Sequence, residues 1–533
     1  MAMPISLSTV LPELILVAAG CVVLLLGQAT RESWRRLMPW VALVSLAAAI
    51  GVVLSQARSA GAWGHPRDIG SGLAYASIAF FVRMSALELG IILTLVNWSQ
   101  ARRSERGEFL SMMLFSLTGL LLVGPADNLL ILFLALELVS IPTYIMVVLG
   151  RTRPAGLEAG TKYFFLGALA AAVMAYGFSF LYGVSGTASL SGMVAGVTRA
   201  LQQPGTLECG LATVGVVLSL GGLLFKIAAV PLHFYVADVY QGAASPVAGL
   251  LGFVPKLAGL VAILKIVLIA GPWGGDDTPA FWLLWIIAVA SMTVGNVLAL
   301  RQTNVKRLLA YSGVAHAGYM LVGVLAGPLA GQADGVGRFG LMGDGAGAAL
   351  YYVVIYGIAN LGAFAVLGLL RVRDEPCETL RDVAGLLRRQ PGLALLLVLT
   401  MFTLMGLPPT PGFWGKLGLF GSALAVSGTT PVLGHGSWLI ALVIIAVLNS
   451  ALAAAYYLRV IAAVLLYESD HPAHAVRNEA QQIGAMLCGF LLLIFMFLPG
   501  GLIRAGREAT SELAQQVETT TAILDHTSDR STQ

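Results

Sequence analysis

The stretch Leu211–Val230 reads LATVGVVLSLGGLLFKIAAV, and Pro231 follows it directly. A helix of about 20 residues rises about 30 Å, the thickness of the hydrocarbon core of a bilayer. The single charge in this stretch is Lys226, and a lysine inside such a span costs roughly 2.5–3.5 kcal/mol. Pro231 lacks a backbone donor and predicts a break in the helix beside the lysine. A broken helix with an ionisable group inside the membrane is typical of ion transport.

The composition predicts an all-α polytopic membrane protein. Of 533 residues, 58% are hydrophobic and only 11% are charged, whereas soluble domains carry about 25% charged residues. The net charge of +4 gives no indication of a nucleic-acid partner. No CxxC pair joins the four cysteines, which argues against iron–sulfur, zinc and c-type haem sites. Apolar runs predict about fourteen spans, at 8–29, 38–56, 73–98, 109–124, 128–149, 158–184, 210–240, 246–270, 280–300, 304–326, 346–370, 393–426, 436–467 and 481–503.

Two of these spans are long and interrupted by prolines, 210–240 and 393–426. The second contains GLPPTPGFWGK, from Gly406 to Lys416. Each is the fourth span of a five-span block, and a second copy of an odd block must enter the membrane from the opposite side, which predicts inverted repeats. The expected parts are an N-terminal three-helix segment, two five-helix repeats, a last span and a polar, exposed tail, at 1–107, 108–270, 280–467, 468–503 and 504–533.

The loop arginines and lysines predict the orientation. Most of them fall on one side of the membrane when the loops are numbered alternately, and positive loops face the cytoplasm. We therefore expect both termini on the periplasmic side of a bacterial inner membrane.

Glu137 lies near the middle of LLILFLALELVSIPTYIMVVLG, and Pro142 follows it as Pro231 follows Lys226. A carboxylate there must pair or be protonated, and Lys226 is its natural partner. One interpretation is a proton switch, in which moving the carboxylate changes whether the lysine holds a proton. The alternative is a static structural ion pair.

Four further lysines lie within predicted spans. Lys162 follows Glu158 by one helical turn, a spacing that favours a plain surface pair. Lys256 and Lys265 are nine residues apart and face opposite sides of one helix, so we expect Lys256 to face the interior and Lys265 to snorkel to the interface. Lys416 follows the second break and mirrors Lys226.

Other polar residues are open to two interpretations. His233 and His316 could relay protons or be hydrogen-bonded structural residues. Asp238 suits a cap or loop anchor, and Asp127 and Asn128 suit helix N-caps. Three more charged residues lie within predicted spans. Arg83 and Glu88 are poorly spaced for mutual contact and stay unassigned. Arg459 is expected at the cytoplasmic interface.

Three motifs carry a family resemblance. FKIAAVPLHFYVADVYQGA (225–243), RLLAYSGVAHAGY (307–319) and GLPPTPGFWGK resemble the antiporter-like subunits of respiratory complex I, and the DVYQGA ending looks like the N, or subunit 2, type. The resemblance implies a proton relay, with His233 as a further candidate, through Glu137, Lys162, Lys226, Lys256, His316 and Lys416. For Lys162, this role differs from the plain surface pair with Glu158 that the local spacing favours.

The resemblance also implies the setting of the chain. Its partners would be other membrane subunits of complex I, lipid, protons and internal water. No redox cofactor would lie in this chain, since NADH, FMN, iron–sulfur clusters and quinone belong to other subunits of such a complex. The alternative function is a subunit of a cation/proton antiporter with the same fold.

Overall fold

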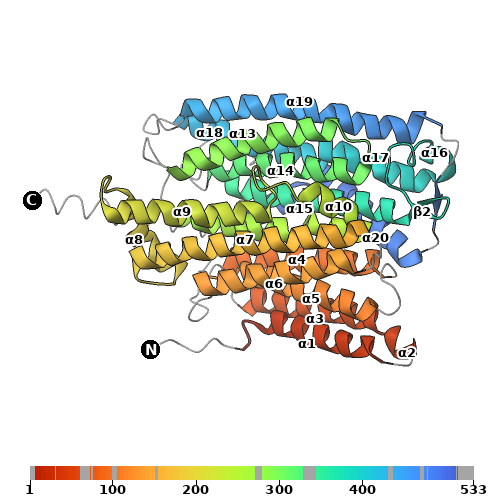
Figure 1. Ribbon diagram of the computed structural model, residues 1–533, viewed down its shortest axis with the longest axis horizontal. Coiled ribbons are helices and arrows are strands. Elements are labelled where there is room, and N and C mark those ends of the chain that lie inside the picture. Colours follow the sequence, from red (N-terminus) through yellow and green to blue (C-terminus); the bar gives the residue numbers. More distant parts are fainter. Residues whose placement is uncertain are drawn as a thin grey trace, which may run out of the picture.

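The chain forms a bundle of long helices in a computed structural model (Figure 1). The structure describes residues 7–29, 32–59, 73, 76–98, 105–149, 154–270, 279–327, 344–429, 436–468, 473–476, 478–511 and 513. The helices are α1 (Leu11–Gly27), α2 (Glu32–Arg35), α3 (Met38–Ser59), α4 (Ala76–Val96), α5 (Arg106–Val123), α6 (Leu129–Val148), α7 (Pro154–Ser185), α8 (Leu190–Leu201), α9 (Leu207–Lys226), α10 (Val236–Gly242), α11 (Ser245–Leu251), α12 (Val254–Ile269), α13 (Pro279–Leu300), α14 (Val305–Ala326), α15 (Gly345–Leu369), α16 (Leu386–Arg389), α17 (Pro391–Met405), α18 (Pro411–Thr429), α19 (Gly436–Leu466) and α20 (Glu479–Phe497).

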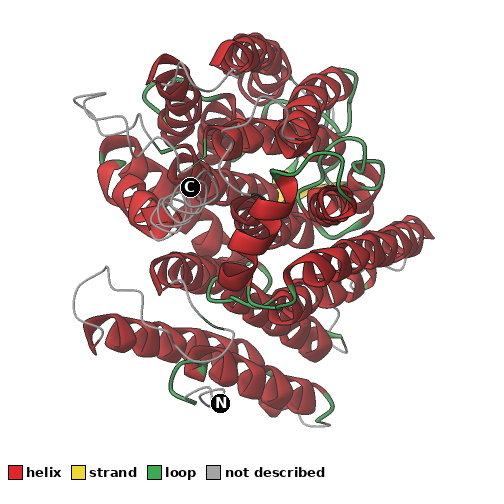
Figure 2. Cartoon of the chain, turned by 90° about the vertical axis from the view of Figure 1, so that its left-hand side faces the viewer, coloured by secondary structure: helices red, strands yellow, loops and turns green. Residues whose placement is uncertain are grey.

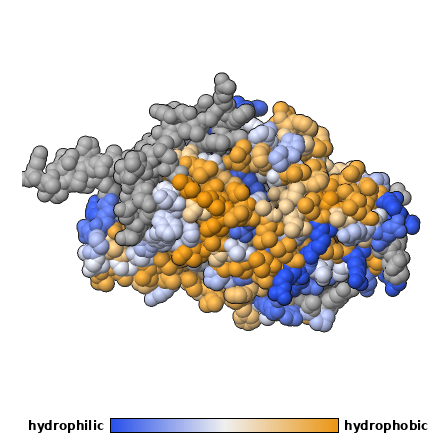
Figure 3. Space-filling model, turned by 90° about the horizontal axis from the view of Figure 1, so that it is seen from above, coloured by the Kyte–Doolittle hydropathy of each residue, from blue (hydrophilic) through white to orange (hydrophobic). Residues whose placement is uncertain are grey.

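The bundle has the span number that the apolar runs predict. Among the described residues, twelve helical segments are long and apolar enough to cross a membrane. The shorter α1 and the interrupted pair α17 and α18 account for the remaining two of the fourteen. Apolar surface covers much of the middle of one face, with hydrophilic patches gathered toward its ends (Figure 3). The all-α polytopic fold class is therefore confirmed.

The two predicted breaks are present, but their lysines sit differently. Helix α9 ends at Lys226, and α10 begins only at Val236. Helix α17 ends at Met405, and α18 begins at Pro411. Lys226 thus lies before its break, whereas Lys416 lies in the second turn of α18, after its break. The two lysines are alike in kind but do not occupy matching places.

A third interruption was not predicted from the sequence. The span expected at 246–270 is divided into α11 and α12 by a turn at Gly252 and Phe253. Pro246 lies in the first turn of α11, and Pro255 lies in the first turn of α12. Proline suits that position because its missing N–H has no partner there in any helix. Proline spacing alone therefore did not reveal where this span is divided.

The polar connections are more ordered than expected. Ser189 caps the unpredicted amphipathic helix α8, accepting from the Gly192 N–H at 3.2 Å. Two short strands after α15 and one after α19 form a small antiparallel sheet in the order β2-β1-β3, which lies at the end of the bundle (Figure 2). The strands are β1 (Leu370–Val372), β2 (Glu375–Pro376) and β3 (His474–Ala475).

The start of the C-terminal tail corrects the expectation of an exposed terminus. Residues 500–511 are helical, and Ala509 and Thr510 are buried. The Thr510 hydroxyl donates to the Asp344 carboxylate at the start of α15. Polar composition could not predict this docking, because it depends on which surface the segment meets. Residues 514–533 lie outside the described residues.

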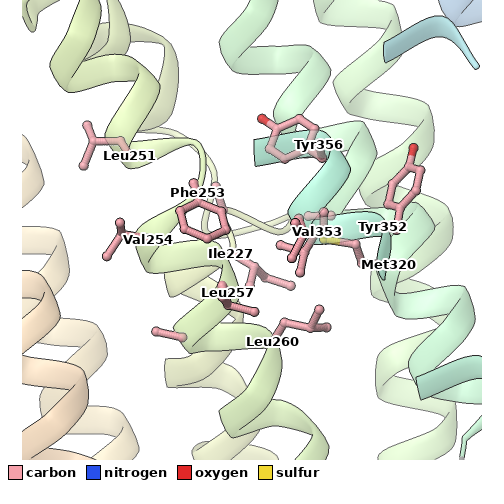
Figure 4. Packing of buried hydrophobic residues seen from close by; sticks show 14 of the residues in the cluster. Ile227, Leu251, Phe253, Val254, Leu257, Leu260, Met320, Tyr352, Val353 and Tyr356 are labelled. Atoms are coloured by element: carbon pink, nitrogen blue, oxygen red, sulfur yellow. The ribbon is translucent and has the colours of Figure 1, made fainter. Parts of the chain in front are cut away.

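Helices α12 and α15 form the centre of the bundle, with every residue of α12 and every residue of α15 except Ala348 buried. Phe253, Leu257 and Leu260 of the α12 region pack toward Tyr352 and Tyr356 of α15 (Figure 4). A helix that is apolar all round is expected in such a core. The ionisable groups on these central helices are therefore held away from lipid.

Candidate functional site

Glu137 and Lys226 form a buried ion pair between α6 and α9. The Lys226 Nζ lies 2.9 Å from Glu137 Oε1, and their side chains are 3% and 16% exposed. Lys226 Nζ also lies 2.6 Å from Ser140 Oγ. The Ser140 hydroxyl donates its own proton to the Leu136 carbonyl, so it accepts from the lysine. The structure thus brings together the predicted carboxylate and lysine and adds a hydroxyl that the sequence analysis missed.

Aromatic rings line this ion pair. Tyr163 of α7 stacks on Tyr235 at a centroid distance of 5.1 Å, and Tyr235 packs on Phe225 at 4.4 Å. The Tyr235 hydroxyl donates to the Phe225 carbonyl beside the end of α9. Because the two side chains are only 3% and 16% exposed, the attraction between Lys226 and Glu137 is stronger than it would be in water.

Lys162 lies in a separate, more exposed network. Its Nζ is 2.7 Å from Glu158 and 2.9 Å from Asp238, and its side chain is 42% exposed. The second oxygen of Asp238 accepts from Arg307 at 2.7 Å. Asp238 is therefore a link between α7, α10 and α14, and the expectation of a cap or loop anchor missed both of its charged partners. The predicted i,i+4 pair of Lys162 is present as well.

Lys256 is buried, and no carboxylate pairs with it in the part of the chain that the structure describes. It donates to the Gly313 carbonyl of α14 and lies over the Tyr356 ring, 5.0 Å from its centroid. A Cβ at Gly313 would lie 3.2 Å from the lysine Nζ and 2.6 Å from the Tyr356 hydroxyl, so a larger residue there would displace these two groups. One turn after Lys256, Gly259 packs against the Lys226 side chain. Helix α12, which carries Lys256, therefore packs against the end of α9 that carries Lys226.

His316 connects three helices at the centre. Its Nδ1 lies 2.7 Å from the Tyr352 hydroxyl of α15, and its Nε2 lies 2.9 Å from the Tyr457 hydroxyl of α19. A neutral imidazole donates through one nitrogen and accepts through the other. The His316 ring also lies 4.8 Å from the Tyr356 ring, which contacts Lys256. These tyrosines were not identified from the sequence, where they resemble ordinary core residues.

Among the described residues, the partners of Lys416 are neutral. Its Nζ lies 2.8 Å from the Met405 carbonyl and 2.8 Å from Ser450 Oγ. Met405 is the last residue of α17, so the break provides one of these acceptors. Lys416 also lies 4.9 Å from the centroid of Tyr319, whose ring is 5.8 Å from His316. Successive contacts thus connect Lys256, by way of Tyr356, His316 and Tyr319, to Lys416.

Lys265 differs from its expected place at the membrane interface. Lys265 is fully buried and does not snorkel, because it donates to the carbonyls of Val123, Gly124 and Ala126 at the end of α5. It is a C-terminal cap. His233 is buried within the first break, and its Nδ1 has no protein partner among the described residues.

Three further predictions concern helix ends. Asn128 caps α6 as predicted, whereas Asp127 binds Ser191 at the start of α8. Arg459 donates to two carbonyls, those of Leu300 and Gln302 after α13.

Comparisons with known proteins identify the family. A model of the NADH:quinone oxidoreductase/Mrp antiporter transmembrane family matches residues 126–444. NADH-quinone oxidoreductase subunit N of Trichlorobacter lovleyi is 37% identical over 462 residues, 86% of this chain and 87% of that protein. This chain belongs to the subunit N family. The subunit N of Rhodospirillum rubrum is 31% identical over 514 residues, 95% of this chain and 97% of that protein.

Solved structures agree with membership in the subunit N family. A chain of respiratory complex I from Thermus thermophilus matches with a TM-score of 0.71 and 31% identity, covering 92% of this chain and 98% of that chain. A chain of the Mrp complex from Dietzia sp. DQ12-45-1b matches with a TM-score of 0.76 at 18% identity, covering 95% and 99%. This second likeness shows a shared fold.

Proposed function

We propose that this chain translocates protons as a membrane subunit of respiratory complex I, using energy from quinone reduction in other subunits. The observation that carries the proposal is the Glu137–Lys226 pair at the end of a broken helix. Intramembrane ionisable groups are expensive and most often functional. The alternative, a static ion pair, does not account for the further buried lysines without carboxylate partners, Lys256 and Lys416.

The proposed switch acts through distance. Glu137 stabilises the Lys226 ammonium while the two are 2.9 Å apart. If a rearrangement of a neighbouring subunit draws the carboxylate away, the ammonium loses that stabilisation in dry surroundings and releases its proton. Lys256 is the proposed next acceptor, because Gly259 on the same face of α12 packs against Lys226. The broken helices provide backbone that can move and admit water.

The remaining steps follow the contacts of the central residues. The proton would pass by way of Tyr356 and His316 toward Lys416 and then to the outer side. His316 can accept at one nitrogen and donate at the other, as a relay requires. Lys162 and Asp238 would exchange protons with the opposite side, and His233 is a further candidate there.

The proposal includes the setting of the chain. Both termini lie on the periplasmic side of the inner membrane, and the partners are other membrane subunits of the complex. This chain holds no redox cofactor of its own, and NADH, FMN, iron–sulfur clusters and quinone act in other subunits. The 37% identity to a subunit N favours this function over that of a cation/proton antiporter. Sodium-dependent transport by the isolated chain would favour the antiporter.

The test is Lys226→Ala in the assembled complex, reconstituted into vesicles with NADH and quinone. We expect proton pumping per NADH oxidised to fall at least about tenfold, because the proton holder beside Glu137 is lost. The control is Arg388→Ala, which removes an exposed surface pair with Glu468 and is expected to leave pumping unchanged. Wild-type pumping by the Lys226 variant would overturn the proposal.

A further inference from the structure

Helix α4 carries two opposite charges that face different ways. Arg83 is buried, and its guanidinium lies 2.7 Å from Glu13 of α1 and 3.1 Å from the Thr9 carbonyl. Glu88 follows five residues later, which is about 140° around the helix. Its side chain is exposed on the bundle surface, and no partner is found for it in the part of the chain that the structure describes. Arg83 is thus satisfied inside the bundle, whereas Glu88 faces outward.

The exposure of Glu88 conflicts with its depth. It lies eight residues before the end of α4, about 12 Å along the helix axis, and therefore within the apolar layer. Helix α4 packs against α3, α5 and α20. Two of these neighbours expose apolar side chains, with Val44 of α3 at 66% and Met486 of α20 at 62%. Lipid chains would cover these apolar side chains, but they would leave the Glu88 carboxylate without a hydrogen-bond donor.

We infer that the outer face of α4 around Glu88 is a contact surface for a transmembrane helix of another subunit, which brings a lysine or arginine to the carboxylate. Charge complementarity carries this choice of partner, because a cation is the counterpart that lets a carboxylate remain inside a membrane. The same helix already shows this solution on its inner face, where Arg83 meets Glu13. A lipid headgroup is excluded as the partner, since Glu88 lies more than two helical turns from the end of α4.

This inference rests on the proposed function only in requiring an assembled complex, and it assigns Glu88 no part in the relay. Its first test compares Glu88→Leu with Glu88→Gln for the amount of assembled complex on native gels. If Glu88 faced lipid, Glu88→Leu would give at least as much assembled complex as the wild type. If Glu88 faces a basic partner, Glu88→Leu is expected to lower the assembled fraction by roughly fivefold or more, because the partner's cation is left buried and unpaired. The assembled fraction of Glu88→Gln is expected to fall between those of the wild type and Glu88→Leu.

A second measurement keeps the inference testable if a variant fails to fold. The amount of this chain in membranes, measured without its partners, shows whether Glu88→Leu changes folding alone. A photo-crosslinking residue at Met84 or Ile91, which share the outward stripe of α4, is then activated in the purified wild-type complex. We expect the captured peptide to be a transmembrane segment that contains lysine or arginine.

The final step is a charge exchange. Glu88→Lys combined with replacement of the captured basic residue by glutamate is expected to restore assembly that Glu88→Lys alone abolishes. Crosslinks to lipid alone, or normal assembly of Glu88→Leu, would overturn the inference. Either result would leave the relay intact, since that is judged by the pumping of the Lys226 variant.

Discussion

The two broken helices hold their lysines in opposite electrostatic surroundings. Lys226 ends the first half of its span and has a carboxylate, Glu137, at 2.9 Å. Lys416 begins the second half of its span and has a carbonyl and a hydroxyl, each at 2.8 Å. The sequence motifs made these two sites look equivalent, but among the described residues only the first has a carboxylate beside its lysine.

This difference suggests a division of roles. A site with a mobile counter-charge responds to events in a neighbouring subunit, because the interaction changes steeply with distance in dry surroundings. A site with neutral, backbone-anchored partners has fixed surroundings and responds to the arrival or departure of a proton. In the proposed relay, we therefore assign α6 to the input and α18 to the output.

Glu137→Gln is expected to have the largest effect. It keeps the shape of the side chain but leaves the Lys226 ammonium buried without a counter-charge, and breaking a buried pair costs about 3–5 kcal/mol. We expect pumping to fall by more than about tenfold and the thermal stability of the complex to fall with it. Vesicle pumping assays and calorimetry measure the two effects.

A double variant checks that Glu137 acts through Lys226. Glu137→Gln together with Lys226→Ala is expected to be no worse in pumping than Lys226→Ala alone, because residues in contact are not additive. Independent, additive losses would show that Glu137 has a role outside the pair.

Lys416→Met is expected to stop pumping while preserving stability, in contrast to Glu137→Gln. Removing this lysine leaves only neutral acceptors, and the apolar stem is replaced by one of similar length. Pumping should fall by about tenfold, with a change in unfolding temperature smaller than that of Glu137→Gln. A loss of stability equal to that of Glu137→Gln would contradict the comparison between the two sites.

The serines that accept hydrogen bonds from the two lysines, Ser450 and Ser140, give a finer test. Ser450→Ala removes one of the two acceptors of Lys416, whereas Ser140→Ala leaves Lys226 with its carboxylate. A hydrogen bond to a charged group contributes about 1.5–3 kcal/mol. We expect Ser450→Ala to slow pumping severalfold and Ser140→Ala to slow it about half as much on a logarithmic scale. A larger effect of Ser140→Ala would mean that Lys226 depends on its serine more than Lys416 does.

The sequence predicted what depends on local pattern. The spans, the two proline breaks and the Glu137–Lys226 pairing followed from apolar runs, prolines and the cost of charge in a membrane. The sequence did not predict what depends on three-dimensional packing. Lys265 resembled a snorkelling residue because the carbonyls that it caps come from a helix about 140 residues earlier.

The aromatic residues around His316 illustrate the same limit. Tyr352, Tyr356 and Tyr457 look like core residues in the sequence, and only the meeting of α14, α15 and α19 places them around one imidazole. The family resemblance supplied Lys162 as a relay candidate, but it did not reveal the contact with Asp238.

The carboxylates at the starts of α6 and α15 give the smallest predicted effect. Asp127 in the first half binds Ser191 at the start of α8, and Asp344 in the second half binds Gly347 and Thr510, which fastens the helix over 500–511. Burial raises the pKa of the Asp344 carboxyl above its ordinary value.

The sign of the pH effect follows from that direction. The docked state favours the neutral acid, so docking is strongest at low pH and weakens as the pH rises through the raised pKa. A spin label at Glu508, which is exposed, should therefore become more mobile with rising pH. Asp344→Asn, which cannot ionise, should remove this dependence, while Asp127→Asn should leave it unchanged. Equal pH dependence in the wild type and in Asp344→Asn would mean that another group governs the docking of this helix.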